Sequence, residues 1–204
     1  MNYLKSLIFK INRSNFHFSC MAITMVDLES EILAEEQEKH QQISNLKRKR
    51  EFQNVRLLRN LQIGKKAISY DAIGKPNLKD KKIFISISHS KNYVAFAHDT
   101  STIGIDIEEL SPRILKVWER FAHSEELALF DKTSIYDMTV LWTIKEALFK
   151  LNTSAGVDFR NDLRIKSKDG NIFLCEMKSE DGYRTVKMET CAYKNLIISY
   201  NINQ

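Results

Sequence analysis

Hydrophobic and polar positions alternate in the middle of the chain as they do along β-strands. Isoleucine occupies every second position at Ile83, Ile85 and Ile87 of "KIFISISHS", and successive side chains of a strand point to opposite faces of a sheet. The runs "NYVAFAHD" and "STIGIDIEEL" follow and have the same character. The pattern therefore predicts consecutive strands between residues 83 and 109.

Other segments are predicted to be helical. An acidic helix is expected from an N-cap at Asp27 to about His40, and a basic helix from about Ser44 to Gly64. The longest helix is expected over 134–151, and shorter ones at "PRILKVWERF" and at "SEELALF", which Ser124 would cap. A strand at "FHFSCMAITMV" and three or four strands near the C-terminus complete the prediction.

The composition indicates a globular protein. The 204 residues are 43% hydrophobic, and no apolar run approaches the roughly 20 residues that a membrane helix needs. The first residues lack the apolar region of a secretory signal, so we expect a cytoplasmic protein that does not enter a membrane. Cys20, Cys175 and Cys191 are far apart and odd in number, which favours small buried residues over a disulfide or zinc site.

Charge is unevenly distributed along the chain. Residues 47–82 contain twelve Lys or Arg and three acids, an excess of nine positive charges, whereas residues 27–38 contain six acids and no base. A cationic surface of this kind suits phosphates or an acidic partner, but it is also compatible with a solvated helix that binds nothing. Nucleic acid is a less suitable partner, because the segment lacks interleaved surface aromatics and a known binding signature.

The strand at residues 101–110 contains two carboxylates on one face. Asp106 and Glu108 are two residues apart, so their side chains lie side by side and repel one another unless a cation or proton lies between them. The pattern is compatible with a metal site or with a solvated strand face.

The long helix has two different faces. Trp142, Lys145, Glu146, Phe149 and Lys150 share one side at three- and four-residue spacing, opposite an apolar stripe. By themselves, Glu146 and Lys150 are also compatible with a surface ion pair worth about 0.3–0.5 kcal/mol. Likewise, a histidine at a strand end, such as the one in "SISHS", can bind an anion or merely satisfy a turn.

The joint order of several short motifs is more specific than any one of them. "GKP", "ISHS", "GIDIE", "RFAHSEE" and "WTIKEALFK" follow one another between about Arg48 and Lys150. In this order they resemble the 4′-phosphopantetheinyl transferase superfamily. The resemblance implies transfer of the phosphopantetheine arm of coenzyme A to a serine of an apo acyl, peptidyl or aryl carrier protein. Adenosine 3′,5′-bisphosphate is the other product, and Mg²⁺ is required, with Mn²⁺ as an alternative.

The resemblance also implies roles for residues of the last motifs. Asp106, Glu108 and Glu146 would be the metal ligands, and Lys145 and Lys150 would hold the pyrophosphate. Oxygen ligands of this kind suit Mg²⁺. Glu125 would be the general base for the carrier serine, with a metal-bound water relayed through Glu108 as the alternative.

At the nucleotide end, the resemblance assigns His89 to the 3′-phosphate, with Ser88 and Lys75 close by. Arg50 and Arg56 fit the basic helix that holds the same phosphate. Residues 53–55 depart from the small residues usual in the family before Arg56. The choice between the two arginines therefore stays open.

The resemblance further implies an α+β fold of two pseudo-symmetric lobes, each a small antiparallel sheet packed on a long helix. We expect residues 1–100 to form an N-terminal lobe with the nucleotide-end contacts and residues 101–204 to form a C-terminal lobe with the metal-binding carboxylates. The active site would lie in a cleft between lobes of a monomer, and the partner would be an acidic carrier protein that binds transiently. A non-catalytic carrier-binding homologue and a basic nucleic-acid-binding module are the alternatives.

Overall fold

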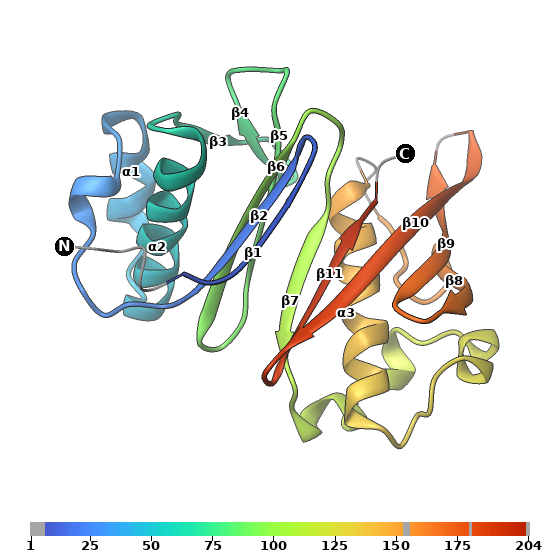
Figure 1. The fold of residues 1–204 in the computed structure, drawn as a ribbon. Helices are drawn as coiled ribbons and strands as arrows, with labels where there is room; N and C mark the ends of the chain where they lie inside the picture. The colour runs from blue at the N-terminus through green and yellow to red at the C-terminus, as the bar shows by residue number, and fades with distance from the viewer. Residues whose placement is uncertain (1–6, 153–155, 180, 203–204) are drawn as a thin grey trace. The chain divides into compact units, whose positions relative to one another are not determined.

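The structure is a computed structural model that describes residues 7–152, 156–179 and 181–202. The chain divides into two compact units, Met1–Thr102 and Ile103–Gln204. Each unit contains an antiparallel sheet and one long helix packed on it (Figure 1). The α+β class and the antiparallel sheets expected from the sequence are confirmed. Within the described residues, no helix combines the length and the apolar character needed to cross a membrane.

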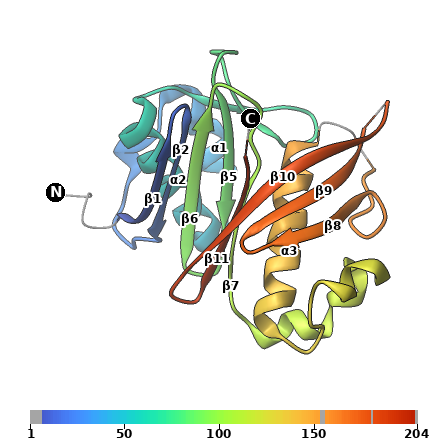
Figure 2. The same cartoon turned by 45° about the vertical axis from the view of Figure 1, so that its right-hand side comes forward.

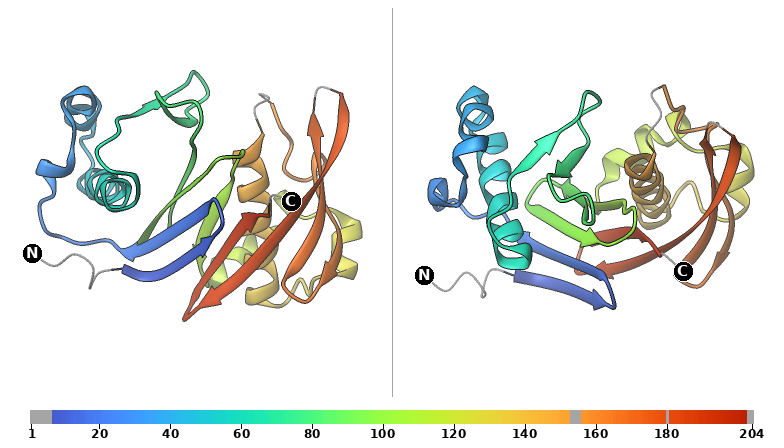
Figure 3. Two further views of the ribbon diagram at one scale, coloured as in Figure 1. Left: turned by 45° about the horizontal axis from the view of Figure 1, so that its top comes forward. Right: turned by 90° about the horizontal axis from the view of Figure 1, so that it is seen from above.

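The first unit is built around a sheet with the strand order β1-β2-β6-β5. Its strands are β1 (Leu7–Arg13), β2 (Phe16–Ala22), β5 (Phe84–His89) and β6 (Tyr93–Asp99), and β3 (Ile68–Tyr70) pairs separately with β4 (Pro76–Leu78). The helices are η2 (Glu29–Glu31), α1 (Ala34–Gln42) and α2 (Leu46–Ile63). Helix α2 packs against β6 and β2, and Figure 3 shows α1 on the same side of the sheet.

Local sequence explains the limits of α2. The side chain of Asn45 accepts a hydrogen bond from the Arg48 backbone N–H at the start of the helix. Gly64 ends it with a φ of +74°, a conformation that glycine adopts without the steric cost of a Cβ atom. Val55 and Leu58 then pack with Phe96 of β6 in the core of the first unit.

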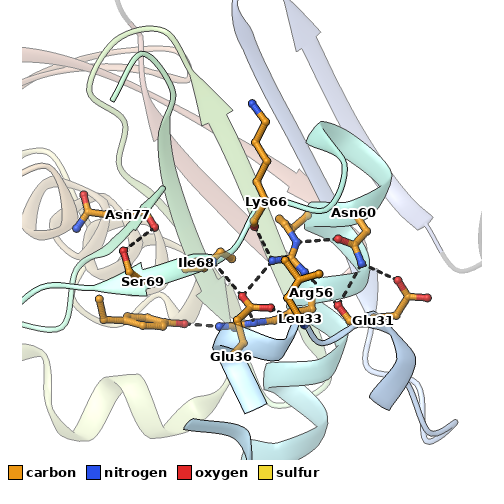
Figure 4. Close-up of polar contacts among 11 residues, drawn as sticks. Glu31, Leu33, Glu36, Arg56, Asn60, Lys66, Ile68, Ser69 and Asn77 are labelled. Atoms are coloured by element: carbon orange, nitrogen blue, oxygen red, sulfur yellow. Dashed lines mark hydrogen bonds and ion pairs between the residues drawn. The ribbon is translucent and has the colours of Figure 1, made fainter. Parts of the chain in front are cut away.

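A buried ionic network holds α1 against α2. Glu36 Oε1 accepts hydrogen bonds from Arg56 Nε at 3.2 Å, Arg59 Nη1 at 3.0 Å and the Ile68 backbone N–H at 3.0 Å (Figure 4). Its other oxygen accepts from the Leu33 backbone N–H. Glu36, Arg56 and Arg59 are almost fully buried. Buried charges persist only when they are paired and hydrogen-bonded, so the three side chains depend on one another.

The second unit is built around a sheet with the strand order β7-β11-β10-β9-β8. Its strands are β7 (Ile105–Glu109), β8 (Leu163–Asp169), β9 (Ile172–Ser179), β10 (Gly182–Tyr193) and β11 (Leu196–Asn201). Between β7 and β8 lie η3 (Pro112–Lys116), η4 (Trp118–Arg120), η5 (Ser124–Ala128) and α3 (Ile135–Leu151). Helix α3 packs on β7 and β11, across one face of the sheet (Figure 2).

Gly104 allows α3 to approach the start of β7 closely. A Cβ atom at this position would overlap the backbone carbonyl oxygen of Ala147 and lie 2.9 Å from Leu151 Cγ. Any larger residue would therefore push the strand away from the helix. The backbone N–H of Gly104 donates to Asn201 Oδ1 at 2.8 Å, which ties the same point to β11.

Several predicted elements differ from those observed. The single acidic helix expected over 27–40 is replaced by η2 and α1, and the segment "PRILKVWERF" forms the two short 3-10 helices η3 and η4. His123, not Ser124, caps η5. Strand β1 was not expected. Among the cysteines, Cys20 and Cys175 are buried and Cys191 is half-buried.

Replacing Glu36 tests the ionic network of the first unit. We expect Glu36→Ala to lower the free energy of unfolding by about 3–5 kcal/mol, because two arginines stay buried without their shared carboxylate. Urea unfolding of the full chain measures this. Glu38→Ala, at an exposed position of the same helix, serves as the control. A similar small loss in both variants would contradict the role of Glu36.

Replacing Gly104 tests the close packing of β7 on α3. The added methyl group of Gly104→Ala meets helix backbone, which cannot rotate away. We therefore expect a loss of about 2 kcal/mol or more, at the upper part of the range for overpacked sites. Thermal and urea unfolding measure it, with Ser167→Ala at an exposed strand position as the control. Wild-type stability of Gly104→Ala would show that the strand and helix are not held this closely.

Candidate functional site

Helix α3 supplies a hydrogen-bond donor to each carboxylate of β7. Asp106 and Glu108 lie two residues apart on the strand. Lys150 Nζ donates to Asp106 Oδ1 at 2.8 Å and to the backbone carbonyl oxygen of Ile105 at 2.9 Å. Trp142 Nε1 donates to Glu108 Oε1 at 3.1 Å. The two predicted acids therefore face the helix and belong to a polar site.

Glu146 is the third acid of this site and lies one helical turn from both Trp142 and Lys150. Burial first and the negative charge of Asp106 second raise the pKa of Glu146 to about 7, although Lys150 lowers it. Burial and then Asp106 likewise raise the pKa of Glu108 to about 7. The structure thus brings Asp106, Glu108 and Glu146 close enough to repel one another, and we call them the carboxylate cluster.

The chemistry of the carboxylate cluster fits a hard divalent cation. The atoms that it offers as metal ligands are all carboxylate oxygens, and both Mg²⁺ and Mn²⁺ bind such oxygens. Burial first and the negative charge of Asp106 second raise the pKa values of Glu108 and Glu146. Within the described part of the chain, however, no three His, Cys, Asp or Glu side chains already stand in a metal-ligand arrangement. The acids are therefore neighbours rather than a preformed coordination shell.

Lys145 lies apart from this cluster. Its ammonium is fully buried and donates to the carbonyl oxygens of Phe121 at 2.7 Å and Phe159 at 2.9 Å, and it pairs with Glu126 Oε2 at 2.8 Å. An ammonium group has three N–H donors, and these contacts use all of them. The position expected for a pyrophosphate-binding lysine is therefore occupied by a structural ion pair in this structure.

The two glutamates of "HSEE" have different environments. Glu125 is exposed and pairs with Arg164 at 3.0 Å and Lys166 at 3.5 Å, and these cations, Arg164 foremost, lower its pKa. A lowered pKa makes a carboxylate a weaker base. Glu126 is buried and also accepts from the His123 backbone N–H at 2.7 Å, which completes a capping box at the start of η5.

The residues expected at the nucleotide end lie in the first unit. His89 ends β5, its side chain is 42% exposed, and its Nε2 lies 3.9 Å from Glu51 Oε2. Ser88 is buried. Lys75 is half-buried, and its backbone N–H donates to Asp71 Oδ1 at 2.8 Å in the turn before β4. A carboxylate beside His89 is unfavourable for a phosphate unless the histidine or other cations compensate.

The two candidate arginines of α2 also have protein partners. Arg56 is buried against Glu36, and its guanidinium stacks on the Phe52 ring at 3.4 Å. Arg50 Nη1 donates to the Val26 carbonyl oxygen at 3.1 Å and to Gln53 Oε1 at 3.0 Å. The side chain of Arg50 is 20% exposed. Arg50 is therefore the more accessible of the two, and Arg56 is part of the core.

Sequence reasoning gave Gly104 and Glu126 no role. A signal was present for each. An isolated glycine at the start of a strand often marks a close approach of another backbone, and "HSEE" places a glutamate three residues after a capping position. Neither signal states which element the residue will contact, so both roles became clear only with the structure.

Comparison with known families supports the last three motifs, "GIDIE", "RFAHSEE" and "WTIKEALFK". Residues 102–197 match the family model described as "ACPS: 4'-phosphopantetheinyl transferase superfamily". The matched region contains the whole carboxylate cluster together with Trp142, Lys145 and Lys150.

Curated bacterial proteins are similar to parts of the chain. "4'-Phosphopantetheinyl transferase psf-1" of Bacillus pumilus is 29% identical over 136 residues, which are 64% of this chain and 53% of the relative. "4'-Phosphopantetheinyl transferase gsp" of Aneurinibacillus migulanus is 36% identical over 81 residues, 38% of this chain and 34% of the relative. "4'-Phosphopantetheinyl transferase Sfp" of Bacillus subtilis (strain 168) is 35% identical over 99 residues, which are 45% of this chain and 44% of the relative. The chain spans about half or less of the length of these relatives.

The crowding of the carboxylates predicts how stability depends on pH. Glu146 has a pKa of about 7 in the folded chain and an ordinary value of 4.5 when unfolded, so the folded state binds its proton more tightly. The contribution to stability is therefore fully present below about pH 4.5 and is lost as the pH rises to about 7. Because a shift of one pKa unit corresponds to about 1.36 kcal/mol, the free energy of unfolding should fall by on the order of 3 kcal/mol for this group.

Glu146→Gln removes the charge and keeps the shape. At about pH 8 we expect the variant to unfold at higher urea concentration than the wild-type chain in the absence of divalent ions, and the difference to shrink towards pH 4.5. Glu119→Gln, at an exposed position, should unfold at the same urea concentration as the wild-type chain at both pH values. A Glu146→Gln variant less stable than wild type at about pH 8 would show that the carboxylate is not under electrostatic strain.

Proposed function

We propose, because residues 102–197 match the model of the 4′-phosphopantetheinyl transferase superfamily, that the chain transfers the 4′-phosphopantetheine arm of coenzyme A to a serine of an apo carrier protein. Adenosine 3′,5′-bisphosphate is the other product. The family match over residues 102–197 and the names of the similar bacterial proteins support this activity. The carboxylate cluster beside Lys150 is the observation that carries the proposal.

In this proposal Asp106, Glu108 and Glu146 hold Mg²⁺, or Mn²⁺, together with the pyrophosphate of coenzyme A. The raised pKa values of the two glutamates, which come from burial first and from Asp106 second, support it, because a divalent cation would stabilise the charged form of both side chains. When bound, the ion supplies charge neutralisation for phosphoryl transfer and fixes the orientation of the phosphates. The protein contributes the position of the three acids on β7 and α3.

Lys150 is a cation that contacts this site directly. Its side chain is 26% exposed and pairs with Asp106. The ammonium group has three N–H donors, so it could donate to a phosphate while it keeps its ion pair with Asp106. There it would stabilise the negative charge that develops on the leaving adenosine bisphosphate. Lys145 has no such role in the proposal, because its three donors are used inside the fold.

The carrier serine must lose a proton as its oxygen attacks phosphorus. Glu108 suits this step better than Glu125 does. Glu108 belongs to the carboxylate cluster that would hold the pyrophosphate, so a water molecule bound there could pass the serine proton to it. Glu125 is exposed and its pKa is lowered by Arg164 and Lys166. We therefore propose Glu108, directly or through a water molecule, as the proton acceptor.

For the nucleotide end we retain Lys75, Ser88, His89 and Arg50 as candidates, in the first unit. Arg56 is replaced in this role by Arg50, which is the more accessible arginine. The excess of positive charge over residues 47–82 supports an acidic carrier protein that docks transiently, an effect that should weaken as salt rises. A monomeric and cytoplasmic enzyme without nucleic-acid binding completes the proposal.

The direct test is incubation of the full chain with coenzyme A, Mg²⁺ and candidate acidic apo carriers, followed by mass measurement of the carriers. The expected result is one carrier whose mass rises by the phosphopantetheine arm, and no rise when Mg²⁺ is chelated. Binding of a carrier without any change of mass would identify a non-catalytic homologue instead. Binding of nucleic acid at physiological salt, without binding of coenzyme A, would favour the basic module.

Asp106→Asn tests the role of the carboxylate cluster in the same assay. We expect turnover to fall by about 10³-fold or more while coenzyme A affinity changes little, because the lost charge stabilisation is greatest in the transition state. Asp169→Asn, at an exposed strand end, should keep wild-type turnover. Equal turnover in the two variants would remove the cluster from the mechanism.

A further inference from the structure

We propose that Trp142 is a positioning residue that holds Glu108 in place for the divalent cation, and that Lys145 acts by fixing the aromatic residues around Trp142. This inference rests on the proposed metal site and assigns a role to two residues that do not contact the cation. It is carried by a continuous series of contacts within the second unit.

The first contact is the hydrogen bond from Trp142 to Glu108. The indole Nε1 lies 3.1 Å from Oε1 of the carboxylate, and a hydrogen bond to an ionised acceptor is stronger than one between neutral groups. Asp106 repels Glu108 from the same face of β7. A donor on the helix opposes that repulsion and keeps one oxygen of Glu108 at a fixed point, which leaves the other oxygen oriented for a ligand.

The second set of contacts fixes the indole ring itself. The Trp142 ring lies 4.9 Å from the Phe121 ring and 5.6 Å from the Phe159 ring, measured between centroids. Phe149 packs in turn on Phe159 at 4.9 Å. Aromatic pairs at these distances have preferred geometries. The N–H of Trp142 can therefore point in few directions other than towards Glu108.

Lys145 fastens the two residues that hold the indole. Its ammonium binds the backbone carbonyl oxygens of Phe121 and Phe159, the same residues whose rings flank Trp142. Its third donor binds Glu126, which is held in turn by the backbone N–H of Ile165 at 2.9 Å. Phe121 and Phe159 are far apart in sequence, so a buried charge that binds both backbones sets the spacing of the aromatic rings.

Lys145 and Trp142 are three residues apart on α3 and therefore neighbours on the helix surface. Glu146 lies one turn after Trp142 and Lys150 one turn further, and both contribute to the cluster directly. The helix thus presents residues that build the cation site and residues that hold its members in position. Lys145 of "WTIKEALFK" need not bind a phosphate, because its charge is already paired with Glu126 inside the fold.

The test compares two tryptophan variants of the full chain. Trp142→Phe keeps an aromatic ring and removes the N–H, whereas Trp118→Phe makes the same change at the other of the two tryptophans, outside the site. Mn²⁺ is titrated without coenzyme A, and free Mn²⁺ is followed by electron paramagnetic resonance. We expect Trp142→Phe to weaken Mn²⁺ binding by about 10- to 100-fold, as for other residues that orient a metal ligand, and Trp118→Phe to match wild type.

Tryptophan fluorescence gives an independent readout. In Trp118→Phe, Trp142 is the one remaining tryptophan of the chain, so addition of Mg²⁺ should change its emission as Glu108 binds the cation. Equal Mn²⁺ affinity of Trp142→Phe and wild type, or emission insensitive to Mg²⁺, would overturn the positioning role. A wild-type chain that binds no Mn²⁺ would overturn the proposed metal site, and this inference with it.

Lys145→Met and Phe159→Leu separate positioning from phosphate binding. If Lys145 acts by fixing the aromatic residues, both variants weaken Mn²⁺ binding measured without coenzyme A. If Lys145 instead binds pyrophosphate, Lys145→Met weakens coenzyme A binding measured without metal and leaves Mn²⁺ affinity unchanged, and the proposal fails. Phe159→Leu alters no charge, so it gives a result even if Lys145→Met does not fold because Glu126 is left unpaired.

Discussion

Mutual repulsion of three carboxylates is the constraint on which the second unit depends. Asp106 and Glu108 on β7 face Glu146 on α3, and two of the three have pKa values raised to about 7 by burial and by their neighbours. Such a cluster persists only where the fold supplies compensating contacts. Lys150 provides a charge and Trp142 a hydrogen bond. Gly104 permits the approach of strand to helix that brings all of them together.

Buried charge is used in two different ways in this protein. In the first unit Glu36 is shared by Arg56 and Arg59, and in the second Lys145 pairs with Glu126. These side chains are buried and paired with one another within the fold, so they are not accessible to a ligand. The carboxylate cluster has the opposite character, because burial and then the charge of Asp106 raise the pKa values of Glu108 and Glu146 to about 7. Whether a charged side chain is structural or functional in this protein therefore depends on how fully its charge is compensated by neighbouring groups, and not on its residue type.

The sequence predicted local features well where one periodicity dominated. The long helix, the alternating strands and the α+β class agree with the structure. Predictions failed where short segments depended on distant partners. The acidic helix is interrupted, because Glu29–Glu31 forms its own 3-10 turn before α1 begins at Ala34. The residues of "PRILKVWERF" likewise form two short 3-10 turns, of which η3 packs on α3, a choice that helix propensity alone does not decide.

The sequence by itself determined that Asp106 and Glu108 share a strand face and that Glu146 and Lys150 are one helical turn apart, since both follow from backbone periodicity. Only the tertiary structure decided that these two elements meet. It also decided that Lys145 is enclosed while Lys150 reaches the acids, and that Glu126 is buried while Glu125 is exposed. Neighbouring residues of the same type received different environments because burial and partners come from segments far away in the chain.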